Sequence, residues 1–88
     1  MGNKGKVEQP KRLAEKLCRI RLKLGLSQTG MAEALEKHGV KIQRGYIGNY
    51  EIKARVPSLL ILLAYAEIAG VSTDKLINDK LDLPAKFK

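Results

Sequence analysis

The sequence contains one cysteine, one phenylalanine and no tryptophan among its 88 residues, and it has no long hydrophobic run. Cys18 can form neither an intrachain disulfide nor a cysteine-pair metal site, which predicts a reducing, cytoplasmic setting. The most apolar run, residues 59–66, is far shorter than the roughly 20 residues that span a bilayer. The first ten residues lack the apolar segment of a secretory signal. We therefore expect a cytoplasmic protein that has no membrane partner.

Groups that could perform catalysis are equally scarce. The single histidine, His38, lies beside Gly39 in a polar turn, and Cys18 falls on a predicted helix flank near leucines. We find no nucleophile with a neighbouring base, no paired carboxylates and no glycine-rich phosphate loop in the sequence. The sequence predicts no enzyme, and we expect no catalytic residue, no metal and no cofactor.

The residues that are abundant favour helices and a polyanionic partner. Helix formers dominate, and glycine and proline separate the apolar stretches, so we expect one small all-α domain. The formal net charge is +8, and residues 1–23 hold eight Lys/Arg against two Glu, whereas residues 57–88 hold four of each sign. This asymmetry indicates nucleic acid, because basic side chains release the counterions of phosphates. The alternative is that excess lysine only keeps a small domain soluble.

Apolar spacing and capping signals divide the chain into a compact bundle of five helices. The first is predicted over residues 10–24, with Pro10 at its first position and Gly25 after its end. Ser27 then caps a second helix that stops near His38 and Gly39. A third begins near residue 42 or 43, a fourth spans 59–69 between Ser58 and Gly70, and a short fifth follows Ser72.

The third element, IQRGYIGNYE, carries two glycines within four positions, and each costs about 1 kcal/mol in a helix. The helical period puts Ile47 and Tyr50 on the core face and both glycines on the opposite strip. Glycines there could let the backbone settle closer to a partner. The alternative is that Gly45 belongs to the preceding turn and the helix starts later.

The order of these fragments resembles the lambda-repressor and Cro-like (XRE-type) helix-turn-helix DNA-binding family. The resemblance covers roughly residues 13–78 and is carried by IRLKLGLSQ (20–28), MAEAL (31–35), IGNYE (47–51), VPS (56–58) and AGVSTDKL (69–76). It implies that the second and third helices form the helix-turn-helix, with the third in the major groove. The EKHGVK turn is longer than usual in the family, and Gly48 stands where serine is common.

The resemblance also assigns roles to single residues. Arg44 could read guanine and Asn49 adenine, whereas the alternative for Arg44 is a phosphate contact alone. Gln28 matches the family position that bonds a phosphate at a helix N-terminus. The full expected DNA-binding set is Gln28, Thr29, Gln43, Arg44, Gly45, Tyr46, Gly48, Asn49, Lys53 and Arg55. Arg21 and Glu51 match a structural ion pair that ties the first helix to the third.

The fourth helix is apolar nearly all round, which predicts a surface for self-association. With Leu59, Leu62, Tyr65 and Ala66 assigned to the core, the expected homodimer surface comprises Leu60, Leu63, Ala64, Ile68, Leu81, Leu83 and Phe87. The last three belong to a C-terminal tail, residues 79–88. The alternative is that this tail folds back and covers the fourth helix within one chain. Residues 1–9 read as a basic N-terminal arm that either follows a DNA groove or stays disordered.

These observations predict a regulator, most often a repressor in this family, that binds a (pseudo)palindromic operator in double-stranded DNA as a homodimer. We expect it in the cytoplasm of a prokaryote or from a phage, associated with the nucleoid. The alternative function is an antitoxin or coactivator-like module on the same fold, whose protein partner binds the fourth helix and the tail.

Overall fold

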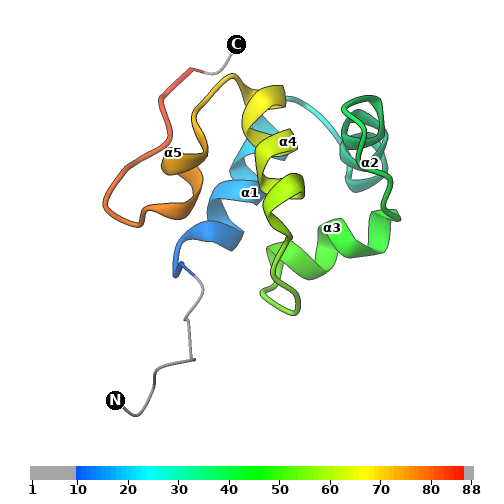
Figure 1. Ribbon diagram of the computed structural model, residues 1–88, viewed down its shortest axis with the longest axis horizontal. Coiled ribbons are helices and arrows are strands. Elements are labelled where there is room, and N and C mark those ends of the chain that lie inside the picture. Colours follow the sequence, from blue (N-terminus) through cyan, green and yellow to red (C-terminus); the bar gives the residue numbers. More distant parts are fainter. Residues whose placement is uncertain (1–9, 87–88) are drawn as a thin grey trace.

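The computed structural model describes residues 10–86, and these form five α-helices (Figure 1). The helices are α1 (Leu13–Lys23), α2 (Gln28–Lys37), α3 (Arg44–Glu51), α4 (Leu59–Ala69) and α5 (Thr73–Ile77). The expected all-α class is therefore confirmed. None of the helices in the described part of the chain is long and apolar enough to cross a membrane. The predicted N-terminal arm and Phe87 lie outside the described residues.

Local signals set most helix ends as the sequence predicts. The hydroxyl oxygen of Ser27 accepts a hydrogen bond of 2.9 Å from the Gly30 N–H at the start of α2, and Ser58 accepts one of 3.4 Å from Ile61 at the start of α4. Gly70 ends α4 in a left-handed conformation, with φ of 74°. The long turn between α2 and α3 ends at Gln43, so Gly45 is the second residue of α3 and the later start is wrong.

The start of α1 differs from the prediction, because the helix begins at Leu13 rather than at Pro10. The preceding N–H groups of Lys11 and Arg12 donate to the carboxylate of Asp79, over 2.9 and 3.0 Å. Free N–H groups at a helix start need an acceptor, and here it comes from the far end of the chain. The sequence spacing of α1 contains no signal for this long-range cap.

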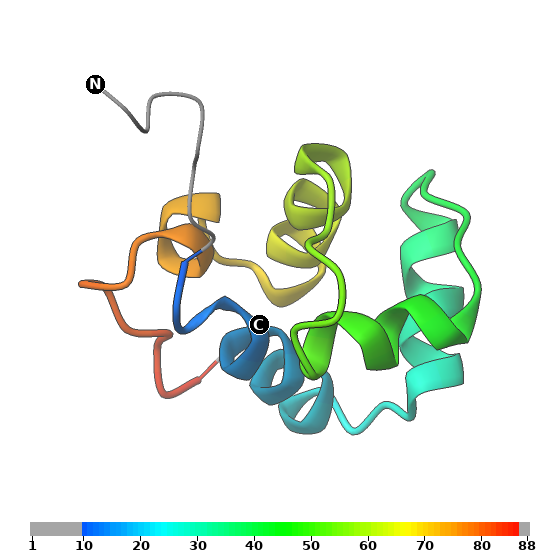
Figure 2. The ribbon, with the colours of Figure 1, turned by 90° about the horizontal axis from the view of Figure 1, so that it is seen from below.

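The core lies where the helices converge. Fully or nearly fully buried side chains come from every helix, and among them are Leu17, Ile20, Met31, Leu35, Ile47, Tyr50, Tyr65 and Leu76. In both views α2 and α3 lie together at one end of the molecule, α5 and the C-terminal segment lie at the other, and α1 and α4 pass between them (Figures 1 and 2). The helix-turn-helix thus packs on both of these helices, with α3 against α1 and α2 against α4.

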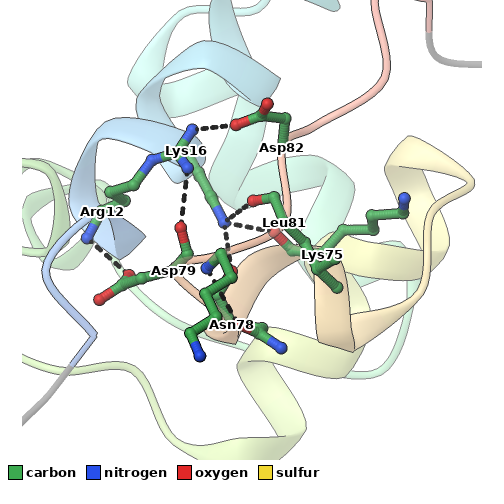
Figure 3. A network of polar contacts seen from close by, with 8 residues as sticks. Arg12, Lys16, Lys75, Asn78, Asp79, Leu81 and Asp82 are labelled. Atoms are coloured by element: carbon green, nitrogen blue, oxygen red, sulfur yellow. Dashed lines mark hydrogen bonds and ion pairs between the residues drawn. The ribbon is translucent and has the colours of Figure 1, made fainter.

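The C-terminal segment folds back onto α1. Lys16 is 1% exposed, and its ammonium group donates to the backbone carbonyls of Lys75, Asn78 and Leu81 over 2.7, 3.0 and 2.7 Å (Figure 3). The Arg12 guanidinium donates to the carbonyl of Asp79 and pairs with the carboxylate of Asp82 at 2.6 Å. Residues 78–82 therefore belong to the folded unit rather than to a free tail.

Burial in this bundle corrects the expected dimer surface. Ala64 and Leu83 are 3% and 6% exposed and belong to the core, so neither can meet a second chain. Ile68 and Leu81 are half-buried. Leu59, assigned to the core from the sequence, is 74% exposed, and Ile61 is buried in its place. A helix that is apolar all round has no periodic contrast, so the sequence could not fix which face turns inward.

Candidate nucleic-acid interface

The α3 helix presents one bare, polar face to solvent. Ile47 and Tyr50 anchor the opposite face in the core, at 0% and 5% exposure. Most of the expected DNA-binding residues are exposed, namely Thr29, Gln43, Arg44, Gly45, Tyr46, Lys53 and Arg55, whereas Gln28, Gly48 and Asn49 are half-buried. The structure thus gathers the whole predicted set around α3 and the adjoining start of α2.

A two-pronged ion pair between Arg21 and Glu51 fixes α3 against α1. The guanidinium Nε donates to Oε2 over 2.7 Å and Nη2 donates to Oε1 over 3.0 Å, with the side chains 14% and 8% exposed. The hydrogen bonds to Glu51 raise the pKa of Arg21 above its usual value, although burial opposes this. Arg21 also donates to the carbonyl of Leu26, just before α2. The predicted structural pair is present and orients the exposed face of α3.

Gln28 borders α3 on the side nearest α2. A β-carbon added at Gly48 would lie 3.4 Å from both the amide nitrogen and the amide oxygen of Gln28. The same amide lies 3.5 Å from a carboxylate oxygen of Glu51. Gln28 therefore lies over α3 at Gly48, at an ordinary contact distance from an added β-carbon, whereas no atom lies within 4 Å of a β-carbon added at Gly45. The two glycines, interpreted alike from the sequence, have different surroundings.

The opposite side of α3 carries a cation on an aromatic ring. The guanidinium carbon of Arg55 lies 4.8 Å from the centre of the Tyr46 ring. Between them the chain turns sharply at Lys53, whose φ of 67° is in the left-handed region. The carbonyl of Asn49 accepts hydrogen bonds from the N–H groups of Ala54 and Arg55, which secures the turn. The DNA-binding set predicted from the sequence includes Tyr46, Lys53 and Arg55, but the stacking of Arg55 on Tyr46 was not predicted.

Charge around the site is of one sign. Residues 38–58 contain four exposed cations, Lys41, Arg44, Lys53 and Arg55. The single acidic residue of this segment, Glu51, forms an ion pair with Arg21. Such a surface attracts a polyanion and repels basic partners. The DNA-binding set predicted from the sequence does not include Lys41, although a lysine in the turn before α3 could have been added to it on position alone. Among the residues that the structure describes, no group of His, Cys, Asp and Glu could hold a metal ion.

Comparison with known proteins agrees with this geometry. A family model described as helix-turn-helix matches residues 19–76. Among solved structures, the chain is similar to the P22 c2 repressor protein, determined in complex with synthetic operator 9T in the presence of Tl+. The two are 21% identical with a TM-score of 0.65, over 76% of this chain and 94% of that one, which shows a shared fold. No curated protein matches the chain.

Proposed function

Because the chain belongs to the lambda-repressor/Cro-like (XRE-type) helix-turn-helix family of DNA-binding transcription regulators, we propose that it is a repressor that occupies a specific operator as a homodimer. The observation that carries this proposal is the exposed face of α3, flanked by four cations and held in place by Arg21 and Glu51. Residues 10–78 would form the DNA-binding domain together with residues 79–83, which pack onto it, and the segment 1–9 would add basic charge.

In this proposal α3 lies in the major groove and reads bases with Arg44 and Asn49. Arg44 at the first turn of α3 is exposed and makes no ion pair within residues 10–86, so its guanidinium is available to guanine O6 and N7. Each good bidentate contact contributes about 1 to 3 kcal/mol of discrimination between bases. Gln28 and Thr29 at the start of α2 would bind phosphate and set the register.

Selection of bound sequences from a random DNA pool tests the reading of bases. We expect a site with two-fold related halves roughly 34 Å apart, which is one helical turn. Arg44→Ala should lower affinity for the selected site by a factor of about 5 to 150 and relax the preference at one base pair in each half. An unselected pool, or unchanged affinity for the selected site, would count against sequence-specific reading.

The homodimer would form through the α4 leucine patch, which we define as Leu59, Leu60 and Leu63. These residues are 74%, 68% and 45% exposed and lie on adjacent turns of α4. Leu60→Gln with Leu63→Gln should shift a concentration-dependent dimer to monomer in sedimentation velocity. Leu22→Gln is the matched control, because Leu22 is 60% exposed but lies on α1. Equal effects of both changes would contradict the patch.

The second candidate, a protein-interaction module, is favoured by the same leucine patch. Salt dependence separates the two functions, since log affinity for DNA falls with log salt by about 0.9 for each phosphate neutralised. We expect a steep loss of binding to duplex DNA as salt is raised. If binding to DNA is weak and indifferent to salt while the leucine variants abolish a protein complex, the interaction module is the correct function.

A further inference from the structure

Tyr46 and Arg55 form a structural unit beside the reading face of α3. Tyr46 lies in the first turns of α3 and is 38% exposed, and the Arg55 guanidinium carbon lies 4.8 Å from its ring centre. Arg55 makes no ion pair within residues 10–86. Burial raises the pKa of Tyr50, and the charge of Arg55 partly offsets this, which agrees with a guanidinium lying along α3. The ring of Tyr46 thus holds a cation that has no carboxylate partner.

The backbone of Arg55 is fixed at its other end. Its N–H donates to the carbonyl of Asn49 over 3.2 Å, and the N–H of Ala54 donates to the same oxygen over 2.8 Å. Lys53 supplies the left-handed turn that brings the chain back toward α3. With both its backbone and its guanidinium held, Arg55 loses little side-chain freedom when it binds an anion.

The position of this unit around the α3 axis shows which anion it would meet. Gly48 faces Gln28 of α2, and Tyr46, two residues earlier, lies about 160° around the axis from Gly48. Gln28 and Arg55 therefore border opposite sides of the reading face. A major groove is likewise bordered on its two sides by the phosphates of two strands, so a helix that enters it with Gln28 near one strand brings Arg55 near the other.

We propose that Tyr46 is a positioning residue that holds Arg55 ready for a DNA phosphate, on the side of the groove opposite the strand bound at the start of α2. This inference rests on the proposed DNA-binding function. It gives Tyr46 an indirect role through its ring, rather than a direct contact of its hydroxyl with DNA. Arg55 makes the contact, and its contribution to affinity depends on the ring beneath it.

A double-mutant cycle on duplex DNA tests the proposal. The probe is a fluorescent duplex of random sequence, about two helical turns long, because a phosphate contact does not depend on sequence. Tyr46→Leu should lower affinity about three- to tenfold, as expected when a side chain must be immobilised on binding. The same change should have no further effect in an Arg55→Gln background. Tyr46→Phe, which keeps the ring, should bind DNA with the affinity of the wild type.

The salt dependence and a charge control complete the test. Both Tyr46→Leu and Arg55→Gln should reduce the slope of log affinity against log salt by about one. Lys80→Gln, at an exposed lysine after α5, should change neither the slope nor the affinity. Thermal melting verifies that each variant folds. A loss with Tyr46→Leu that persists without Arg55, or an equal loss with Tyr46→Phe, overturns the positioning role. A wild-type protein without steep salt dependence overturns the DNA-binding function itself.

Discussion

Arg21 and Glu51 lie 30 residues apart in the chain and join α1 to α3 through two hydrogen bonds of 2.7 and 3.0 Å. Because α3 has only eight residues, its orientation depends on such tertiary anchors more than on its own helix propensity. Arg21 also bonds the carbonyl of Leu26, so the same guanidinium holds the entry to α2. One side chain thus relates both helices of the helix-turn-helix to α1.

Glu51→Ala should lower the free energy of unfolding by about 3 to 5 kcal/mol, because it leaves the largely buried guanidinium of Arg21 without its partner. Urea denaturation measures this. Asp82→Asn serves as the comparison, since the carboxylate of Asp82 pairs with Arg12 but is 77% exposed, and it should change stability little. The double substitution Arg21→Met with Glu51→Leu should recover part of the lost free energy of unfolding. Similar effects of Glu51→Ala and Asp82→Asn would show that the α1–α3 pair adds no special stability.

Lys53→Gly should stabilise the fold by about 1 kcal/mol, because a side chain at a φ of 67° is strained and glycine is not. The same change should weaken DNA binding and reduce the salt slope by about one, since it removes a cation beside α3. Lys53→Ala is the matched control, because it removes the charge and keeps the strain. If glycine and alanine give the same melting temperature, the turn stores no strain at this position.

Gly45→Ala and Gly48→Ser should each raise helix stability by up to about 1 kcal/mol, because a β-carbon meets nothing within 4 Å at Gly45 and only an ordinary contact at Gly48. We expect Gly48→Ser to change DNA affinity by placing a hydroxyl beside the amide of Gln28, whereas Gly45→Ala tests clearance on the bare face of α3. Melting temperature and affinity for a selected operator measure both effects. Stabilised variants with unchanged operator binding would remove any functional reason for the glycines.

Asp79 should make stability depend on pH. Hydrogen bonds from the N–H groups of Arg12 and Lys11 hold the pKa of Asp79 below its usual value. The folded chain therefore binds fewer protons than the unfolded chain near pH 4, so this contribution is present above about pH 4 and is lost as pH falls through the lowered pKa. Urea midpoints for wild type and Asp79→Asn should differ at pH 7 and converge at acid pH. A difference that does not change with pH would exclude this carboxylate as the cause.

Tyr65→Phe should leave the protein equally stable or stabilise it by up to about 1 to 3 kcal/mol. The hydroxyl of Tyr65 is buried on α4 and has no hydrogen-bond partner among residues 10–86. Its removal therefore eliminates the cost of burying an unpaired polar group. Burial also raises the pKa of this phenol. Thermal unfolding measures the difference, and Tyr50→Phe provides a comparison at another buried tyrosine. A clear destabilisation by Tyr65→Phe would mean that the hydroxyl is hydrogen-bonded in solution.

Features that depend on near neighbours in the chain were predictable. Ser27, Ser58 and Gly70 mark helix ends within a turn of themselves, and the structure confirms all three. The α3 face follows from a 3.6-residue period that places Ile47 and Tyr50 together. The Arg21–Glu51 pair came from family resemblance, since charge pattern alone does not identify a partner 30 residues away.

Features that depend on distant segments were not predictable. Lys16 falls between Leu13 and Leu17 on the inner face of α1, which was a sign of an unusual lysine, but its three carbonyl acceptors lie 59 to 65 residues later. The cap of α1 by Asp79 is equally remote. On α4 the exposed Leu59 and the buried Ile61 could not be told apart by hydropathy, and only packing against the other helices decides between them.

The bonds of Lys16 and Asp79 also make the packing of α1 depend on residues that lie much later in the chain. The N–H groups at the start of α1 donate to residue 79, and the ammonium group of Lys16 donates to carbonyls within residues 75–81. If α1 packed without those residues, Lys16 would lose water without gaining its acceptors, and the N–H groups of Lys11 and Arg12 would lack a partner. The packing of α1 is therefore complete only when residues 75–81 are in place.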